Sequence, residues 1–259
     1  MPKLFCFSDC HGFFTELKQA LDEARFEPGN SDHLLVGLGD YLDRGNQANE
    51  VIDYLLSVPN KVLIRGNHCD LFEKLCQRGY PLSHDWHNGT ADTILSLASN
   101  TTDWSVACSV AIEKMKPLLD QMVNYFETDN YIFVHSFIPL KSLDGLPKYY
   151  TRNRQFEFNP DWRHAHASAW AEACWSNPFQ LAKDGFLPDK TLVFGHYHTS
   201  WPRHKYEGQP EMGEGADFSI YYGDGYIGLD SCVAVSGRVN VLVIEDEFLE
   251  DNNDITGES

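Results

Sequence analysis

The chain has 259 residues, of which 42% are hydrophobic and 22% are charged, an ordinary composition for a globular protein with a sizeable core. No apolar run reaches the roughly 18 residues of a membrane-spanning helix, and Asp9 interrupts the N-terminal run too early for a signal peptide. The formal net charge of −18 repels nucleic acid backbones and anionic lipids, so we expect neither a nucleic-acid polymer nor a membrane as a partner. The seven cysteines include no Cys-x-x-Cys pair, which favours reduced thiols and a cytoplasmic location.

Short runs rich in β-branched and aromatic residues predict the strands. Amphipathic helices separate the first of them: Phe13, Leu17 and Leu21 recur at helical spacing, as do Val51 and Leu55. Strands that are apolar throughout and alternate with helices indicate an α/β fold whose sheets are covered on both faces. The predicted strands are Lys3–Ser8, His33–Leu38, Lys61–Ile64, Tyr131–Val134, Thr191–Phe194, Tyr226–Leu229 and Val239–Ile244.

Two longer regions follow a different pattern. Residues 71–130 are mostly helical in pattern, with Pro117 as a kink or a boundary. Residues 139–188 are aromatic-rich and irregular, with a helix predicted around His164 to Cys174. We interpret both regions as helical and loop elaborations beside the sheets and not as independent domains.

The last part of the chain is predicted to close the fold. The glycines and tyrosines of Trp201–Asp224 are typical of a surface loop, and Ser236–Arg238 predicts a hairpin turn between the final two strands. Residues 1–246 are therefore expected to form a single domain. Residues 247–259 carry part of the acidic excess and are predicted to form a solvated C-terminal tail.

Each of the five main apolar runs ends in polar residues. Ligands of open α/β sheets bind outside the carboxyl ends of the strands, so these residues are expected to converge if the strands are neighbours. Their shared volume would hold carboxylates, imidazoles, an amide and an arginine. The five endings are Ser-Asp9-Cys-His11-Gly, Gly-Asp40-Tyr-Leu-Asp43-Arg44-Gly, Arg65-Gly-Asn67-His68-Cys, His135-Ser and Gly-His196-Tyr-His198-Thr.

Mixed carboxylate and imidazole clusters are typical of divalent-metal sites, because buried carboxylates without partners are costly. The number of ligands suits two ions, and the two oxygens of Asp40 could bridge ions about 3.5–4 Å apart. The ligands would be Asp9, His11 and Asp40 for one ion, with His198 as a further candidate, and Asp40, Asn67, His135 and His196 for the other.

This arrangement suits hydrolysis of a phosphate ester. A water that bridges two such ions becomes a hydroxide near neutral pH, and it can attack phosphorus directly without a covalent phosphoenzyme. The chain has neither the Gly-x-Ser-x-Gly of a nucleophile elbow nor a P-loop. His68 could then protonate the leaving oxygen as general acid, and Asp43 could hold His68 in its cationic form. Arg44 could bind two phosphoryl oxygens.

These motifs resemble those of the calcineurin-like metallophosphoesterases. Asp-x-His-Gly, Gly-Asp-x-x-Asp-Arg-Gly, Arg-Gly-Asn-His, a later His and a later Gly-His occur in that order, and Gly228-Leu-Asp-Ser231 is similar to the end of that catalytic domain. The second and third motifs are similar to the phosphoprotein phosphatase branch, whose bacterial and phage members include protein phosphatases and diadenosine tetraphosphatases. The resemblance implies a four-layer fold, with two mixed β-sheets packed as a sandwich flanked by helices, and makes residues 1–246 a catalytic domain.

The resemblance also implies roles for individual residues. It implies catalysis by His68 with Asp43, and phosphate binding by Arg44. Asn67 and His68 are expected to contact the substrate beside Arg44. The metal ligands that it implies are Asp9, His11, Asp40, Asn67, His135 and His196.

Three features depart from the family pattern. Cys69 follows His68 where the branch usually has Glu, and Gly-His-x-His adds His198, which is a ligand in the wider superfamily but is usually missing from this branch. A second phosphate-binding arginine is missing from the comparable stretch, Trp175–Asn177. Weaker phosphomonoester binding or a different substrate would follow. The alternatives for that arginine are Arg152, Arg154 and Arg163.

We therefore expect a dinuclear-metal phosphoesterase that acts on phosphomonoesters in the manner of a serine/threonine protein phosphatase. Two alternatives stay open: hydrolysis of diadenosine tetraphosphate or another small phosphoester, and a catalytically idle homologue that binds a partner through the inserted helices. The joint presence of His68, Asp43 and Arg44 argues against the idle form. Mn²⁺ is the metal expected first, with Fe or Zn²⁺ as alternatives, since all three accept mixed oxygen and nitrogen ligands.

Overall fold

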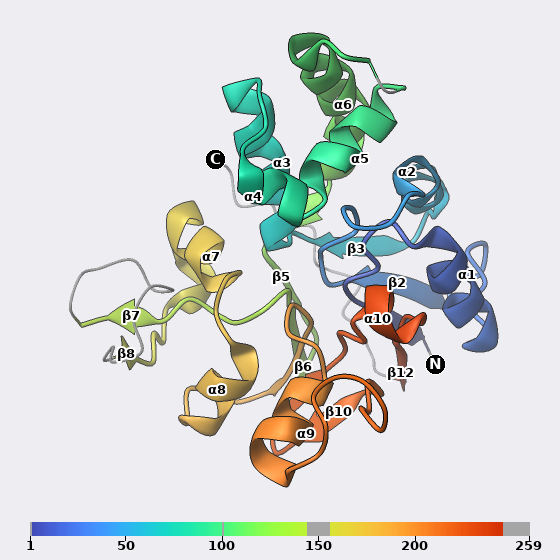
Figure 1. Cartoon of the computed structure of the whole chain (residues 1–259). Helices are drawn as coiled ribbons and strands as arrows, with labels where there is room; N and C mark the ends of the chain where they lie inside the picture. Colours follow the sequence, from blue (N-terminus) through green and yellow to red (C-terminus); the bar gives the residue numbers. More distant parts are fainter. Residues whose placement is uncertain (1, 100, 144–155, 246–259) are drawn as a thin grey trace.

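The computed structural model describes residues 2–99, 101–143 and 156–245, and its framework is two mixed five-stranded β-sheets (Figure 1). The strands are β1 (Lys3–Phe7), β2 (His33–Gly37), β3 (Lys61–Ile64), β4 (Met122–Val123), β5 (Tyr125–Glu127), β6 (Tyr131–Val134), β7 (Lys141–Ser142), β8 (Phe156–Glu157), β9 (Thr191–Phe194), β10 (Tyr221–Gly223), β11 (Tyr226–Gly228) and β12 (Val241–Glu245). The first sheet has the order β12-β1-β2-β3-β4, with all but β12 parallel. The second has the order β10-β11-β9-β6-β5, with β11, β9 and β6 parallel.

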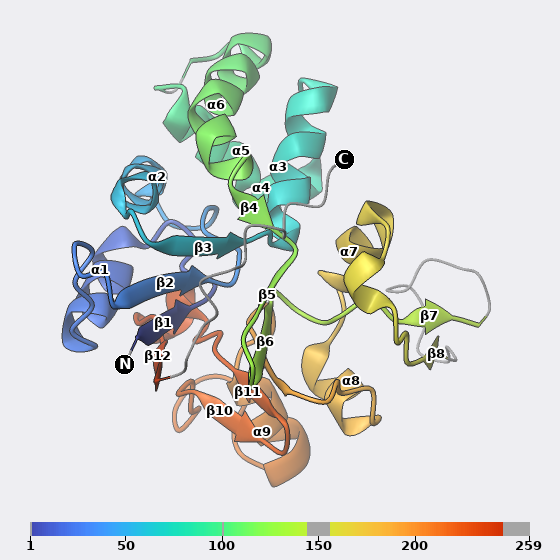
Figure 2. The same ribbon diagram turned by 180° about the vertical axis from the view of Figure 1, so that it is seen from behind.

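Helices cover the outer faces of both sheets. They are α1 (Phe14–Glu23), α2 (Ala48–Ser57), α3 (Asn67–Arg78), α4 (Ser83–His87), α5 (Thr90–Leu97), α6 (Trp104–Leu119), the 3₁₀ turn η1 (Trp162–His164), α7 (Ala167–Ala173), α8 (Pro178–Lys183), α9 (Ser200–Glu207) and α10 (Val233–Ser236). In Figure 1, α1 and α2 lie beside the first sheet, and α3 to α6 project together beyond the end of β3. Helices α7 to α9 lie beside the second sheet. Figure 2 shows the same grouping from behind.

Alternation along the strands divides the apolar side chains between three clusters. On β1, Phe5 and Phe7 pack with the helices of the first sheet, whereas Leu4 and Cys6 point toward the second sheet. Leu4 and Cys6 share the inter-sheet cluster with side chains such as Phe133 of β6. A third cluster joins the outer face of the second sheet to η1, α7 and α8. The layers are therefore helix, sheet, sheet and helix, which confirms the predicted fold class.

Most predicted elements are confirmed. Lys61–Ile64, Tyr131–Val134 and Thr191–Phe194 are strands with the predicted bounds, and the other predicted strands differ only at their ends. The helical pattern of residues 71–130 corresponds to α3 through α6, and Pro117 lies in the last turn of α6. The short strands β4 and β5, at the end of that region, were not predicted because each is too short to show a periodic pattern.

Two predictions near the C-terminus are wrong. Ser236–Arg238 does not connect a hairpin, because β11 pairs with β9 and β10 in the second sheet while β12 pairs with β1 in the first. Gly237, with φ of +66°, instead ends α10. Trp201–Asp224 is also not one loop, since α9 and β10 occupy its two ends. Pro202 is compatible with α9 because the first turn of a helix has N–H groups without intrahelical partners.

The predictions about the C-terminal tail and the extent of the domain are not tested by the described residues. Residues 246–259, which include the predicted tail 247–259, lie outside the described residues, and the extent of the domain, 1–246, stays a prediction. No helix in the described ranges is long and apolar enough to cross a membrane. All seven cysteines are free thiols.

The inter-sheet cluster should carry much of the stability. Phe133 is fully buried between the sheets, so Phe133→Ala should lower the free energy of unfolding by about 3–5 kcal/mol. Phe158 is 39% exposed, and Phe158→Ala makes the same chemical change at a cost of about 0.5 kcal/mol or less. Urea denaturation monitored by circular dichroism measures both. Equal losses for the two variants would contradict this description of the core.

Candidate active site

The polar residues predicted at the strand ends converge where the carboxyl ends of the two sheets meet. Hydrogen bonds join the sheets at this point: the His196 backbone N–H donates to Asp9 Oδ2 at 2.9 Å, and His135 Nδ1 donates to the Leu38 carbonyl at 2.7 Å. Of the predicted metal ligands, all except His198 lie in the two groups of side chains described below. The residues within four positions of a strand end are Asp9 and His11 (β1), Asp40 (β2), Asn67 and His68 (β3), His135 (β6) and His196 (β9).

The loops that carry these residues have an unusual backbone. Asp9, His11, Asp40, Asp43 and His196 all have φ between +45° and +75°. Side chains other than glycine rarely adopt this region, and such strain clusters at functional sites. Backbone hydrogen bonds between the loop after β1 and the loop after β2 hold it in place. The backbone is therefore bent so that the side chains point at one another.

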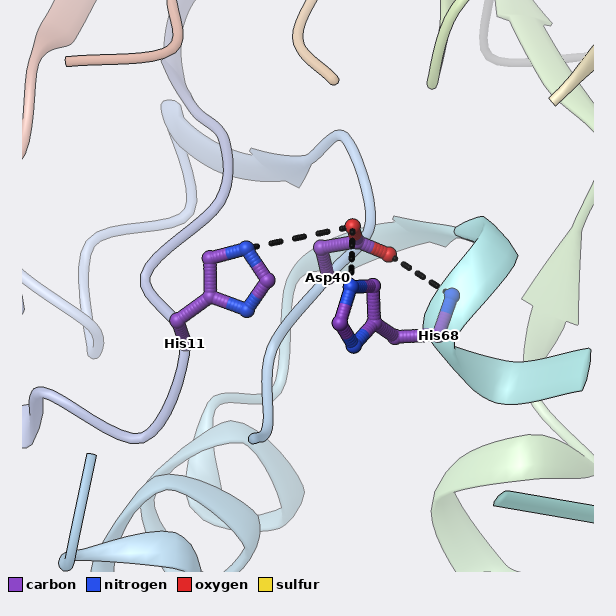
Figure 3. A group of neighbouring side chains, drawn as sticks. All are labelled: His11, Asp40 and His68. Atoms are coloured by element: carbon purple, nitrogen blue, oxygen red, sulfur yellow. Dashed lines mark hydrogen bonds and ion pairs between the residues drawn. The ribbon is translucent and has the colours of Figure 1, made fainter. Parts of the chain in front are cut away.

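One group of side chains surrounds the Asp40 carboxylate. His11 Nε2 lies 3.9 Å and His68 Nε2 lies 3.8 Å from Asp40 Oδ2, and both rings face the same oxygen (Figure 3). Asp9 Oδ1 is 3.8 Å from His11 Nε2. The His68 backbone N–H donates to Asp40 Oδ1 at 3.1 Å, which fixes the carboxylate at the start of α3. All four side chains are buried.

A second group shares Asp40 and lies toward the second sheet. His135 Nε2 is 3.5 Å from Asp40 Oδ2 and 2.8 Å from Asn67 Oδ1. His196 Nδ1 is 3.0 Å from the same amide oxygen. The four predicted ligands of this second position are therefore in mutual contact, and Asp40 lies between the two groups.

Backbone carbonyls set the orientation of two imidazoles. His11 Nδ1 donates to the Leu42 carbonyl at 2.9 Å, and His135 Nδ1 donates to the Leu38 carbonyl. A neutral ring that donates from Nδ1 has an unprotonated Nε2, which is the form that binds metal. Burial, followed by the charge of Arg44, keeps the pKa of His11 well below its ordinary value. The His11 ring thus presents a lone pair toward Asp40.

The carboxylates have opposite pKa shifts. Burial alone would raise the pKa of Asp40, but the surrounding imidazoles, chiefly His135 and His68, hold it below its ordinary value. Burial, and then the charge of Asp40, raise the pKa of Asp9 to about 7. Burial and His135 lower the pKa of His196 to about 3. Asp40 is thus the firm anion of the cluster, and positive charge placed beside it would be stabilised.

The donor set fits divalent metal ions. The 3.5–3.9 Å separations between Asp40 Oδ2 and the imidazole nitrogens are too long for hydrogen bonds. They suit a pair of donor atoms that bind the same ion, with each donor about 2.0–2.2 Å from it. Glycines make room for the carboxylates, since a Cβ on Gly66 would overlap Asp40 and a Cβ on Gly195 would overlap Ser8 and Asp9. These His and Asp groups are able to bind such ions.

A histidine–aspartate pair adjoins the cluster. His68 Nδ1 is 2.6 Å from Asp43 Oδ2, and Arg44 Nη2 is 3.4 Å from His68 Nε2. Burial opposes the charged form of His68, but Asp40 and then Asp43 outweigh it and raise its pKa. Thr90 donates to Asp43 Oδ2 at 2.7 Å, and Thr93 accepts from the Asp43 backbone N–H at 3.1 Å. Neither threonine was predicted, because both are distant in sequence.

The remaining predicted residues have other neighbours. His198 contacts Ser200 Oγ at 2.9 Å and Glu211 Oε1 at 3.6 Å and belongs to neither group, so its role as a ligand stays a prediction. Asn177 caps α8. Arg163 makes two hydrogen bonds to Glu127, at 2.6 and 2.7 Å. The other two alternatives for the second arginine, Arg152 and Arg154, lie outside the described residues.

One buried carboxylate was not predicted as a site residue. Asp230 follows β11 in the same way as the predicted residues follow their strands, and it accepts from the Cys232 N–H at 2.7 Å. Burial, and then the charge of Asp9, raise the pKa of Asp230 well above its ordinary value. The signal in the sequence was the acid directly after the apolar run Tyr226–Leu229.

Comparison with known proteins adds the following. A model of the calcineurin-like phosphoesterase family matches residues 2–213. A candidate diadenosine tetraphosphatase is 18% identical, with a TM-score of 0.49 over 94% of this chain and 91% of that one. A cold-active protein-tyrosine phosphatase of a psychrophilic Shewanella species is 15% identical, with a TM-score of 0.46 over 95% and 76%. A protein serine/threonine phosphatase from Saccharomyces cerevisiae is 13% identical, with a TM-score of 0.47 over 96% and 82%.

The glycine beside Asp40 gives a test of the site's geometry. Gly66→Ala places a Cβ on the Asp40 carboxylate at an extended backbone position that alanine tolerates, so metal affinity should fall about 10–100-fold. Gly29→Ala adds the same methyl group in open space and should leave affinity unchanged. Equilibrium dialysis with metal analysis compares them. Equal metal affinities of the Gly66 and Gly29 variants would show that metal binding does not depend on the position of the Asp40 carboxylate beside Gly66.

Proposed function

The chain belongs to the calcineurin-like phosphoesterase family, and on that premise we propose that it is a dinuclear-metal phosphoesterase that hydrolyses phosphomonoesters, in the manner of a serine/threonine protein phosphatase. One observation carries the proposal: two groups of metal-binding side chains share Asp40, and the His68–Asp43 pair lies at their edge. Family membership supports hydrolysis of a phosphate ester. The geometry supports an assignment of residues to steps.

The chain's own residues would hold two ions. We assign Asp9, His11 and Asp40 to one position, with His198 as a further candidate there. When bound, divalent ions supply positive charge and lower the pKa of a water so that it can attack phosphorus. We propose Mn²⁺ first, with Fe or Zn²⁺ as alternatives, because the donors mix oxygen and nitrogen. We assign the other position to Asp40, Asn67, His135 and His196.

Arg44 and His68 are proposed to act on the substrate. The exposed guanidinium of Arg44 can hold phosphoryl oxygens, and its position 3.4 Å from His68 Nε2 brings the ester oxygen close to that ring. Asp43 accepts from Nδ1, and with Asp40 it raises the pKa of His68, which favours the ring that carries protons on both nitrogens. His68 is then the general acid that protonates the leaving oxygen from Nε2. Asn67 lies beside it and is proposed to contact the substrate.

The general-acid role gives the main test. His68→Ala should lower the metal-dependent hydrolysis of p-nitrophenyl phosphate by about 10²–10⁴-fold with metal content unchanged. His164→Ala removes an exposed imidazole and is the matched control. Turnover of the His68 variant at the control's level would refute the role. No metal-dependent turnover by the wild-type protein would support the idle binding homologue instead.

A second candidate is hydrolysis of a dinucleoside polyphosphate or another small phosphoester. Arg163 is committed to Glu127, so within the described residues it does not reinforce the hold of Arg44 on a phosphomonoester. Phosphopeptides and diadenosine tetraphosphate, assayed in parallel with each divalent metal, separate the candidates. A higher kcat/KM for phosphopeptides supports the first, and the reverse order supports the second.

A further inference from the structure

The start of α5 packs against the loop that carries Asp43 and Arg44. Thr90 Oγ1 donates to Asp43 Oδ2 at 2.7 Å, and Thr93 Oγ1 accepts from the Asp43 backbone N–H at 3.1 Å. A Cβ on Gly89, the residue before the helix, would lie 2.4 Å from the Arg44 backbone nitrogen. The helix is therefore in direct contact with two consecutive residues of the proposed active site.

Thr90 and His68 bind the same oxygen of Asp43. His68 Nδ1 is 2.6 Å from Asp43 Oδ2, and the Thr90 hydroxyl reaches that oxygen from the helix. A carboxylate oxygen has two lone pairs, so it can accept from both donors at once. Rotation of the carboxylate would lengthen both hydrogen bonds. The direction of Oδ2, and with it the orientation of the His68 ring, therefore depends on where the Thr90 hydroxyl lies.

The Thr90 hydroxyl has a rigid support. Thr90 itself is fully buried, and so are the side chains that anchor the helix in the core of the first sheet, Ala91, Ile94 and Leu97. Threonine is β-branched, so few rotamers are open to its side chain. A hydroxyl on such a side chain can point in few directions, and here it points at Asp43.

The backbone of the loop is also held by α5. Asp43 and Arg44 have φ of +75° and +66°, where side chains other than glycine are seldom found. Such conformations persist only where the surroundings hold them. Thr93 supplies part of that hold through the Asp43 N–H, and Gly89 leaves room for the Arg44 backbone. Contacts from α5 thus restrain both the backbone and the carboxylate of Asp43.

We propose that Thr90 is a positioning residue for the reaction: its hydroxyl fixes Asp43 Oδ2, which in turn orients His68 with Nε2 toward the substrate. This inference rests on the proposed function, because the orientation matters for turnover only if His68 acts on the leaving oxygen. A threonine hydroxyl on a helix can instead bond to a carbonyl one turn earlier, but Thr90 donates to Asp43. The helical elaboration of residues 71–130, which contains α5, then contributes to the site as well as to the core.

Removal of the hydroxyl tests the proposal. Thr90→Val keeps the shape of the side chain but has no donor, so kcat for p-nitrophenyl phosphate should fall about 10–100-fold. KM should stay near the wild-type value, because Thr90 is fully buried and cannot contact the substrate. Thr90→Ser restores the donor and should recover most of the loss. Thr128→Val removes another buried hydroxyl, which accepts from the Tyr131 N–H at the start of β6, and should keep wild-type turnover.

A double-mutant cycle separates positioning from a general loss of stability. If Thr90 acts through His68, Thr90→Val should cause no further loss in a His68→Ala background, whereas independent effects would multiply. Equal turnover of Thr90→Val and Thr128→Val, or losses that multiply, would overturn the proposal. Circular dichroism and metal content check the folding of each variant, and Thr90→Ala makes the same test if the valine variant misfolds.

Nuclear magnetic resonance gives a readout that needs no turnover. The Nδ1 proton in the short His68–Asp43 contact should give a far-downfield resonance in the Zn²⁺-loaded protein, assigned by its loss in His68→Ala. Thr90→Val should shift or broaden this resonance, and Thr128→Val should not. An unchanged resonance in Thr90→Val would overturn the proposal. If the resonance changes as expected but the wild-type protein is inactive, the result counts against the proposed function and supports the hold of Thr90 on the His68–Asp43 pair.

Discussion

The structure depends on one buried carboxylate, Asp40. It lies where the carboxyl ends of two sheets meet, and three imidazoles face its Oδ2 within 3.9 Å. A buried anion is tolerated only when hydrogen bonds and positive charge compensate for lost solvation. Here the His68 N–H supplies one hydrogen bond, and the remaining demand is for cations. The surrounding loops have a left-handed backbone, and a side chain at Gly66 would overlap the Asp40 carboxylate.

The convergence of the site could be predicted because its cause is local. Asp9, Asp40 and His135 each lie within three residues of the end of an apolar strand, and parallel strands bring such positions to the same edge. The sequence did not predict which distant residues contact the side chains of the site. Thr90 and Thr93 bind Asp43 across 47 and 50 residues, and no local pattern marks such a contact. The false hairpin at the C-terminus has the same origin, since pairing of β12 with β1 is decided at the far end of the chain.

The departure at Cys69 is explained by packing. Its side chain is buried, its thiol contacts Met122 Sδ at 3.7 Å, and burial raises its pKa to about 12. Carboxylates nearby instead come from Asp70, which accepts from Arg65 at 3.0 Å, and from Glu73, which pairs with the same guanidinium. Arg65 is thereby held at the end of β3 by acids on the first turns of α3. An arginine–carboxylate contact therefore lies close to Asn67 in the sequence, although Cys69 itself carries no charge.

Charge distribution links substrate binding to metal occupancy in the proposed mechanism. The net charge of −18 repels a phosphate at long range, but at physiological salt such repulsion is screened beyond about 8 Å. Arg44 contacts His68 in the site, whereas Arg163 and Arg203 are paired with Glu127 and Asp217. Much of the attraction for phosphate must then come from the ions. Removing the ions would weaken substrate binding as well as the chemical step, because both depend on the positive charge of ions held by Asp40 and the imidazoles around it.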